Sequence, residues 1–399
     1  MLTMGANEVD EAVASAVALL RPAVGRDWVG TNAGGLEWSC RRTAEHIITD
    51  LVVYAARLAG RTQSPNTRLN ITLAGATGLT PADKEAREED VNSGILDVIA
   101  ATGALLTAAI RTAPRDARAF HPAPFRSANR EGFAAMGIAE VLLHTHDIAE
   151  GLGLPYQPPA HLAEFALTRI FPHVRPGPDH WRTLLWATGR ADLPGRARLT
   201  EWSWYNNLVL DTERLRLECV TPAAAADLSA GGTGGFDWIG GGPFEGTREA
   251  AGMAWKAYEE GVLRPEFGLY ILVRREDDRA VGGMGFHGAP DEEGRAKVGY
   301  DLAEAARGNG YATEALRALA EWALARDDVQ SLFATVEPHN TPSQGVLARA
   351  GFVPVNTEPA QPTDPARPTD PARPIDPARP IDPAEVGLQA YELRDRTLN

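Results

Sequence analysis

Cysteine and lysine are both scarce in this sequence of 399 residues. The two cysteines, Cys40 and Cys219, stand far apart in the chain. Small secreted domains that depend on disulfides contain many more, so we expect reduced thiols and a cytoplasmic protein. Lysine occurs only as Lys84, Lys256 and Lys297, and the remaining basic residues are arginine. We attribute this preference, together with the abundant alanine and glycine, to coding bias more than to chemistry.

The sequence also lacks a basic leader and a long hydrophobic run. The first twenty residues are acidic where a signal peptide would be basic, and their apolar positions recur at helical spacing. No apolar run reaches the length of a membrane span. The formal net charge of -14 disfavours binding to nucleic acid and to anionic membranes. We therefore expect neither nucleic acid nor membrane among the partners.

The length of the chain predicts two domains, because 399 residues exceed what one hydrophobic core usually supports. Apolar residues recur with a period near 3.6 throughout the first half, which predicts helices and a four-helix bundle. The expected helices are 8–24, 41–59, 92–113 and 128–150, with a fifth near 160–172. An aromatic and turn-rich segment follows, and we place the domain boundary at 205/206.

The second half alternates strands with helices, which predicts an α/β or α+β domain over 206–399. A short strand and a helix come first, in TERLRLECVTPAAAADL. The other expected strands are 268–275, 280–287, 295–302, 330–336 and 388–394, and the other helices are 244–260, 310–326 and 341–350. Residues 362–382 repeat a six-residue, proline-rich unit. Such a density of proline predicts an extended, solvated insertion between two strands.

One buried-looking helical segment, AEVLLHTHDIAEG at 139–151, carries an unexpected stripe of polar residues. Glu140, His144 and Asp147 are separated by four and three residues, so they lie on one face of a helix. A carboxylate and an imidazole one turn apart suit a metal ion, and they equally suit a hydrogen-bonded pair. His46, on an earlier helix, is open to the same two interpretations.

The loop RGNGYATEAL, which begins at Arg307, is the sharpest motif of the second half. It follows a strand and opens an amphipathic helix, and its glycines allow a tight turn and a close approach to a ligand. Unpaired N–H groups in the first helical turn suit a pyrophosphate. An isolated motif of this kind is often only a turn between a strand and a helix.

A second segment, HNTPSQGVLARAGF, joins this loop in a resemblance to the GNAT family of acetyl-CoA-dependent N-acyltransferases, closest to its RimJ/RimL-like branch. The matching residues are Arg307, Gly310 and Ala312, then Asn340, Ser343, Gly351 and Phe352. The resemblance implies that the loop Arg307, Gly308, Asn309, Gly310, Tyr311 and Ala312 holds the pyrophosphate of acetyl-CoA. It also implies that Asn340 contacts the pantetheine arm.

The implied chemistry is direct attack of a neutral amine on the acetyl carbonyl. The oxyanion then needs a backbone N–H from strand 295–302, and the leaving thiolate needs a proton. Many members of the family carry a tyrosine seven residues after the asparagine, where this sequence has Leu347. Ser343 is our candidate for that proton. Glu337 and His339 are candidate bases.

The first half resembles the DinB-like bundle of mycothiol-dependent maleylpyruvate isomerases. The matching residues are Trp38, Cys40 and His46, then Glu140, His144 and Asp147. The resemblance implies that His46, Glu140 and His144 bind zinc or another divalent metal with one position open, a donor set that suits catalytic zinc. Asp147 would support the site. His146 and Cys40 point off the ligand faces and are not expected to bind.

Three functions remain open from the sequence. The first, which we favour, is an acetyl-CoA-dependent N-acetyltransferase that acts on an amine and carries a fused zinc-binding bundle. The second is a transferase or isomerase that acts at the zinc with a low-molecular-weight thiol such as mycothiol. The third is a non-enzymatic metal or thiol sensor with a module that binds coenzyme A.

Overall fold

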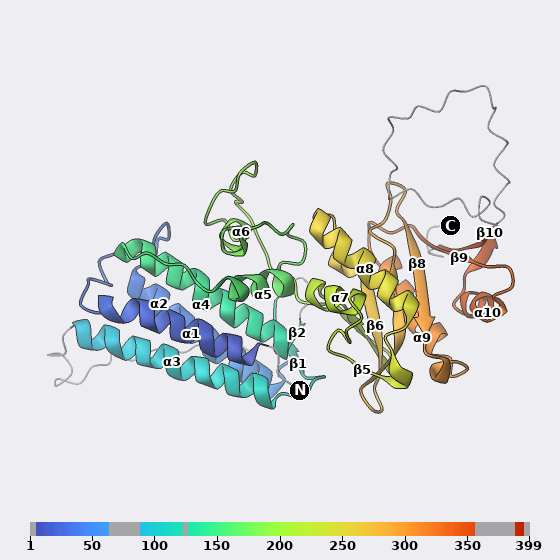
Figure 1. The fold of residues 1–399 in the computed structure, drawn as a ribbon, viewed down its shortest axis with the longest axis horizontal. Helices are drawn as coiled ribbons and strands as arrows, with labels where there is room; N and C mark the ends of the chain where they lie inside the picture. The colour runs from blue at the N-terminus through green and yellow to red at the C-terminus, as the bar shows by residue number, and fades with distance from the viewer. Residues whose placement is uncertain (1–4, 64–87, 123–126, 356–387, 395–399) are drawn as a thin grey trace, which may run out of the picture. The chain divides into compact units, whose positions relative to one another are not determined.

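The computed structural model describes residues 5–63, 88–122, 127–355 and 388–394. The chain divides into two compact units, residues 1–207 and residues 208–399 (Figure 1). The sequence had placed this boundary two residues earlier. The predicted insertion at 362–382 lies outside the described residues.

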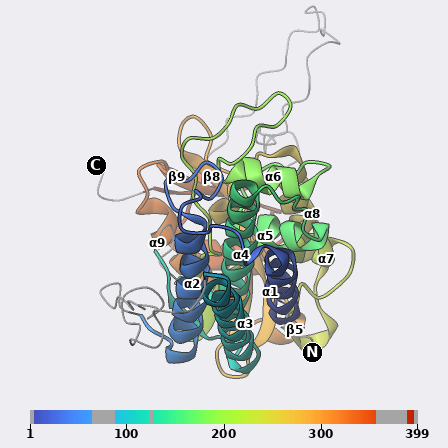
Figure 2. The same cartoon turned by 90° about the vertical axis from the view of Figure 1, so that its left-hand side faces the viewer.

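The first unit is helical. Its helices are α1 (Ala6–Leu20), α2 (Cys40–Gly60), α3 (Glu88–Thr112), α4 (Arg130–Leu152), α5 (Ala160–Ile170) and α6 (His180–Ala187), with a short 3-10 turn η1 (Arg21–Ala23). Strands β1 (Arg118–Phe120) and β2 (Ser127–Asn129) form an antiparallel pair before α4. Helices α1 to α4 lie side by side, with α2 against α3 and α4, and α1 against the same two (Figure 2). Helix α6 falls in the segment that the sequence led us to read as turns.

Helix α4 is the central helix of this unit and is buried on nearly every side. The side chain of Asn129 caps its first turn by accepting a hydrogen bond from the amide of Gly132, and Gly153 ends it in the left-handed region. Two glycines on the helix allow close packing. A side chain at Gly137 would overlap Leu106 of α3, and one at Gly151 would overlap the carbonyl oxygen of Asn32. A helix enclosed in this way forces any polar group on it to find a partner inside the protein.

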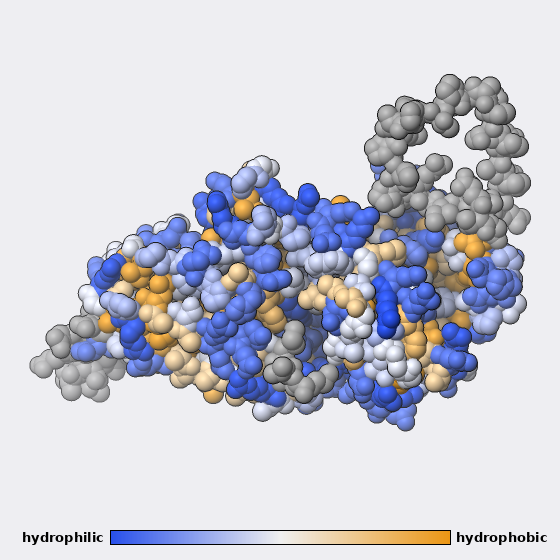
Figure 3. Space-filling model, in the orientation of Figure 1, coloured by the Kyte–Doolittle hydropathy of each residue, from blue (hydrophilic) through white to orange (hydrophobic). Residues whose placement is uncertain are grey.

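Among the described helices, Asp90–Thr112 of α3 is long and apolar enough to span a membrane by length and composition, which the search of the sequence for an apolar run did not single out. A core helix of a soluble protein meets the same criterion, and α3 packs against both α1 and α2. Part of α3 remains exposed, including Leu105 at 55%. Helices α1 and α3 border an apolar groove of about 570 Å³, and apolar residues appear on this face in the surface view (Figure 3).

The second unit is built on a mixed β-sheet with the strand order β10-β11-β9-β8-β7-β6-β4-β3. The strands are β3 (Val209–Asp211), β4 (Leu215–Cys219), β6 (Leu269–Arg274), β7 (Arg279–Phe286), β8 (Arg295–Leu302), β9 (Ser331–Val336), β10 (Val353–Val355) and β11 (Gln389–Arg394), with β5 (Asp237–Trp238) beside β7. The helices are α7 (Pro222–Ser229), α8 (Glu245–Glu260), α9 (Tyr311–Leu324) and α10 (Thr341–Arg349), with short turns η3 (Ile239–Gly241), η4 (Pro265–Phe267) and η5 (Glu304–Ala306). The strands expected after residue 268 all form, and β3, β5 and β10 are additional.

Strands β8 and β9 are parallel neighbours that separate along their length. They pair from Arg295↔Ser331 to Lys297↔Phe333, and within the described strands the pairing ends there. The rest of β8 remains paired with β7 as far as Leu302. The sheet therefore opens between β8 and β9, just before the loop at Arg307.

Candidate functional site

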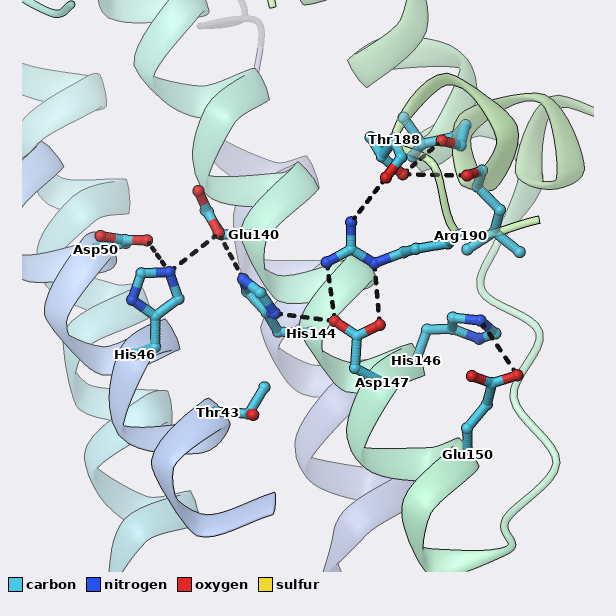
Figure 4. Close-up of polar contacts among 12 residues, drawn as sticks. Thr43, His46, Asp50, Glu140, His144, His146, Asp147, Glu150, Thr188 and Arg190 are labelled. Carbon is cyan, nitrogen blue, oxygen red and sulfur yellow. Dashed lines mark hydrogen bonds and ion pairs between the residues drawn. The ribbon is translucent and has the colours of Figure 1, made fainter. Parts of the chain in front are cut away.

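The structure brings His46 of α2 together with Glu140 and His144 of α4 (Figure 4). The potential ligand atoms of these three side chains all lie within 4.8 Å of one another. One carboxylate oxygen of Glu140 is 3.1 Å from Nε2 of His144 and 3.9 Å from Nε2 of His46. The spacing along α4 supplies two members of the group, and the contact between α2 and α4 supplies the third.

Behind His144, a second layer of polar groups fixes its ring. Nδ1 of His144 lies 3.0 Å from Oδ2 of Asp147, and the guanidinium of Arg190 binds both oxygens of that carboxylate at 2.9 and 2.8 Å. Asp147 is only 3% exposed. The buried carboxylate of Asp147 holds the Nδ1–H of His144, and Nε2 of the ring is therefore directed at Glu140. A carboxylate in this position is usual behind a histidine that binds a metal.

Two further residues of α2 reach this cluster, and the sequence analysis missed both. Asp50 places a carboxylate oxygen 3.1 Å from Nε2 of His46, and the hydroxyl of Tyr54 donates a hydrogen bond to Glu140 at 3.2 Å. They follow His46 by four and eight residues. They share the helical spacing of the stripe on α4, which places all three residues on one face of α2.

His146 and Cys40 lie apart from the cluster. His146 faces Glu150, with 3.8 Å between Nε2 and the carboxylate, and its ring contacts Trp181 edge-on. The thiol of Cys40 is fully buried beside the carbonyl of Ile148, and burial raises its pKa to about 11. A thiol in that state is a packing group, because reactivity and metal binding need the thiolate.

The electrostatics of the cluster favour one bound proton on His144. Burial by itself would lower the pKa of His144, but the hydrogen bonds to Asp147 and Glu140 outweigh burial and raise the pKa to about 9. Burial would raise the pKa of Glu140, yet the hydrogen bond from His144 holds it below the ordinary value. Burial lowers the pKa of His46, whereas burial and the nearby Glu140 raise that of Asp50 to about 8. A cation at Nε2 of His144 would replace the proton there.

In the second unit, the loop after β8 forms the turn that the motif predicts. Gly308 and Gly310 have φ angles of 77° and 79°, and Gly310 is the N-cap of α9. Both angles lie in the left-handed region that glycine adopts without strain. The side chain of Arg307 is exposed and donates to the carbonyl of Leu302 at 3.3 Å. The first N–H groups of α9 and this arginine therefore border the same surface as the end of the gap between β8 and β9.

Arg214, just before β4, braces this loop and was missed by the sequence analysis. Its guanidinium donates to the carbonyl of Asn309 at 2.9 Å and to the carboxylate of Glu314 at 2.7 Å, and it lies over the ring of Tyr311. Glu314 also accepts a hydrogen bond from Thr212 at 2.6 Å. The guanidinium remains 45% exposed, so it offers a positive charge at the loop as well as support.

We expect Arg214→Met to raise the dissociation constant for coenzyme A about tenfold, because a charge-assisted contact and the brace of the loop are lost together. Isothermal titration calorimetry measures this directly. Arg295→Met is the matched control. Arg295 also pairs with a carboxylate and is 47% exposed, but it stands at the opposite end of β8. Equal affinities in the two variants would show that Arg214 makes no contribution to binding.

The candidate residues of α10 and of the loop before it differ in their exposure and in their hydrogen bonds. The side chain of Asn340 caps α10 by accepting from the amide of Ser343 at 3.2 Å, which leaves its NH₂ group as a donor. A carboxylate oxygen of Glu337 lies 3.0 Å from Nε2 of His339, and the two side chains are 60% and 82% exposed. Leu347, at the position of the family's tyrosine, is fully buried.

A cavity of about 760 Å³ adjoins the same loop from the side of α8. It extends from Phe244 and Glu245 at the start of α8 to Asp301, Glu304 and Arg307. Asp301 accepts hydrogen bonds from both the amide and the hydroxyl of Thr247, so it fixes the start of α8 against β8. The carboxylates give this cavity an acidic lining next to the basic loop.

Comparison with known proteins gives a consistent result for the second unit. Residues 214–353 match the family described as "Acetyltransferase (GNAT) domain". The uncharacterized N-acetyltransferase YjdG of Bacillus subtilis (strain 168) is 31% identical over 151 residues, which are 37% of this chain and 90% of that protein. The uncharacterized N-acetyltransferase p20 of Bacillus licheniformis is 33% identical over 90 residues, which are 23% of this chain and 51% of that protein.

Solved structures that match part of this chain include an acetyltransferase from Agrobacterium tumefaciens str. C58. It is 23% identical, with a TM-score of 0.30, over 49% of this chain and 99% of that one. A GNAT-family acetyltransferase from Bacillus anthracis is 16% identical, with a TM-score of 0.30, over 47% of this chain and 98% of that one.

Proposed function

The chain belongs to the GNAT acetyltransferase family, and from this premise we propose that it transfers the acetyl group of acetyl-CoA to a primary amine. The observation that carries the proposal is the conjunction of the glycine turn at Gly308 and Gly310 with the gap between β8 and β9. The turn suits a pyrophosphate, and the gap accepts an extended arm that ends in the thioester.

The backbone of β8 supplies hydrogen-bonding groups to that arm. Lys297 and its neighbours at alternate positions bond to β7, since the amide of His287 donates to the carbonyl of Lys297 and the amide of Ala303 donates to that of Val281. The intervening Tyr300 therefore directs its N–H and C=O away from β7, into the gap. An N–H in this position would stabilise the oxyanion that forms when the amine attacks the carbonyl carbon.

Side chains around the gap would complete the site. The NH₂ group of Asn340 is a hydrogen-bond donor and suits a carbonyl of the pantetheine arm. Glu337 and His339 remain our candidates for accepting the proton of the amine, because they stand where β9 ends. His287, which follows β7, is a further candidate, because its ring lies against Gly299 in the middle of β8.

A screen for turnover tests this function. We expect release of coenzyme A from acetyl-CoA with at least one amine among N-terminal peptides, spermidine and aminoglycosides, and we expect a chelator to leave kcat/KM within about twofold. The second expectation follows because the metal-binding group lies in the other unit. Absence of both coenzyme A binding and turnover in the wild type would refute the proposal. Loss of turnover on chelation would show that the metal takes part.

For the helical unit, we propose a site for zinc or another divalent metal at His46, Glu140 and His144, in keeping with its resemblance to the DinB-like bundle. Bonds of about 2 Å in a tetrahedral site place ligand atoms about 3.3 Å apart. The distances of 3.1 and 3.9 Å from Glu140 to the two imidazoles bracket this value. The residues therefore fit the metal with small rotations of side chains.

Each neighbouring residue would have a definite task at such a centre. Asp147 and Arg190 hold the ring of His144, and Tyr54 orients the carboxylate of Glu140. Asp50 lies beside His46 and could hold a proton next to an incoming ligand. Bound zinc would supply Lewis acidity there. A thiol-dependent reaction, our second function from the sequence, would take place at this centre and needs a coordination position that the protein leaves open.

A further inference from the structure

The gap between β8 and β9 is closed where the two strands pair, which we call its floor, and open at the loop after β8, which we call its mouth. The phenol of Tyr300 lies between these two ends. Lys297 pairs with Phe333 at the floor, and the loop at Arg307 forms the mouth. Tyr300 is three residues beyond the floor. Any arm that enters from the loop toward Lys297 must pass it.

The side chain of Tyr300 crosses to α10. Its hydroxyl donates a hydrogen bond to the carbonyl of Ser343 at 3.2 Å, in the first turn of that helix. Alternate residues of a strand face opposite sides of the sheet, and the neighbouring Asp301 faces Thr247 of α8. The phenol is thus placed on the α10 side, next to the residue that Asn340 caps, and it is half-buried.

Acetyl transfer leaves one proton to be delivered. The nitrogen of the amine forms a bond to the carbonyl carbon, the carbon–sulfur bond breaks, and the sulfur departs with the electron pair. A neutral acid near the sulfur lowers the barrier by protonating it as it leaves. Leu347 cannot do this, and His339 is largely exposed and paired with Glu337.

We propose that Tyr300 is the catalytic acid of this enzyme: its phenolic proton passes to the sulfur of coenzyme A, and the proton that the amine nitrogen loses on forming the amide returns to the phenolate through water. This assignment rests on the proposed acetyl transfer. Ser343, our candidate from the sequence, contributes its backbone carbonyl, which holds the phenol on the α10 side by accepting its hydrogen bond until the hydroxyl turns to the sulfur.

The surroundings of Tyr300 suit this role. Burial raises the pKa of the phenol, so the hydroxyl stays protonated at neutral pH until it is used. The positive charge of Arg349 acts in the opposite direction, lowers the pKa of the phenol and favours the phenolate once the proton has left. One proton leaves the amine nitrogen and one reaches the sulfur, so the phenol ends the cycle in its starting state.

The first test needs no acceptor amine. The thiol of bound coenzyme A is titrated by the ultraviolet absorbance of its thiolate, in the wild type and in Tyr300→Phe. A phenol that donates to the sulfur stabilises the thiolate, so we expect the acid dissociation constant of the bound thiol to fall about tenfold in the variant. Tyr391→Phe is the matched control, because Tyr391 is a buried tyrosine of β11 whose hydroxyl also makes one hydrogen bond, to Gln389.

The second test measures turnover with an amine found in the screen. Tyr300→Phe should lower kcat by about 10²-fold or more, leave the KM for acetyl-CoA within about threefold, and remove the basic limb of the pH profile. Tyr300→His keeps a donor and should move that limb to lower pH. If Tyr300 is only a brace between β8 and α10, the melting temperature will fall while kcat and the thiol titration stay unchanged, and the proposal is then wrong. A wild type that binds no coenzyme A would overturn the proposed function, and this assignment with it.

Discussion

Replacing Gly310 with aspartate should reduce the affinity for coenzyme A more than a hundredfold, whereas replacing it with asparagine should weaken binding less than tenfold. The two substitutions differ only in charge. Gly310 is the N-cap of α9, with a φ of 79° and a ψ of 2°. Asparagine and aspartate both tolerate this left-handed conformation better than other residues, and both are good N-caps, so the fold should survive either change.

The difference between the variants comes from the pyrophosphate. A carboxylate about 5 Å from one negative phosphate group costs about 3 kcal/mol at an effective dielectric constant of 20, which is more than a hundredfold in affinity. Calorimetry in moderate salt, repeated at high salt, measures the effect, and the gap between the variants should narrow as screening increases. If the aspartate and asparagine variants bind coenzyme A equally well, the pyrophosphate does not lie at this loop.

Removal of His144 should abolish stoichiometric metal binding in the helical unit. His144→Ala deletes one nitrogen ligand and leaves the pair between Asp147 and Arg190 in place. We expect elemental analysis to find about one divalent ion per wild-type chain and none in the variant. At a free metal concentration a hundredfold above the dissociation constant, the lost stabilisation is about 2.7 kcal/mol. This corresponds to a fall of roughly 5–10 °C in the melting temperature of a unit of this size.

The matched control lies two residues along the same helix. His146→Ala also removes an imidazole, but His146 faces Glu150 and Trp181, so this variant should keep its metal. Both variants should bind coenzyme A like the wild type. Metal retained in His144→Ala and lost in His146→Ala would mean that the wrong histidine was chosen. A wild type without any divalent ion after metal supplementation would eliminate the site.

Metal uptake should also depend on pH in a defined direction. In the metal-free protein, the pKa of His144 is raised to about 9, so Nε2 carries a proton at neutral pH. The metal must displace that proton, and its apparent affinity should therefore rise about tenfold per pH unit up to pH 9. Proton release on zinc addition at pH 7, followed in a weakly buffered solution, checks the same point.

The elements that the sequence predicted well are those with a long periodic pattern. Helices α1, α2, α3, α5 and α9 combine many apolar positions at one spacing, α4 is apolar on nearly every side, and β8 alternates between two faces. Helix α6 was missed because it is short and lies among aromatic and turn-forming residues. Its start was still signalled by Asp179, whose side chain caps it by accepting from the amide of Arg182.

The residues of the candidate sites also divide into those that a sequence pattern predicts and those whose role depends on tertiary structure. The spacing of Glu140 and His144 within one helix is visible in the sequence, and so is the glycine turn at Gly310. Asp50 and Tyr54 follow the same helical rule, but polar residues on a helix are commonly solvent-facing, and no pattern marks these as buried. Arg214 and Tyr300 act on elements that are distant in the chain. Their roles depend on which strands become neighbours, and that information is tertiary.

The register of β10 and β11 fixes the two ends of the segment between them and leaves the length of that segment open to change. Val355 lies opposite Ala390, so the chain leaves the sheet and re-enters it at one fixed place, whatever lies between. For a solvated segment of the kind that the proline density predicts, each doubling of length costs only about 0.6 kcal/mol in closure entropy. The copy number of the six-residue unit is therefore a nearly neutral trait. Slippage during replication could add or delete units while the acetyltransferase fold remained as it is.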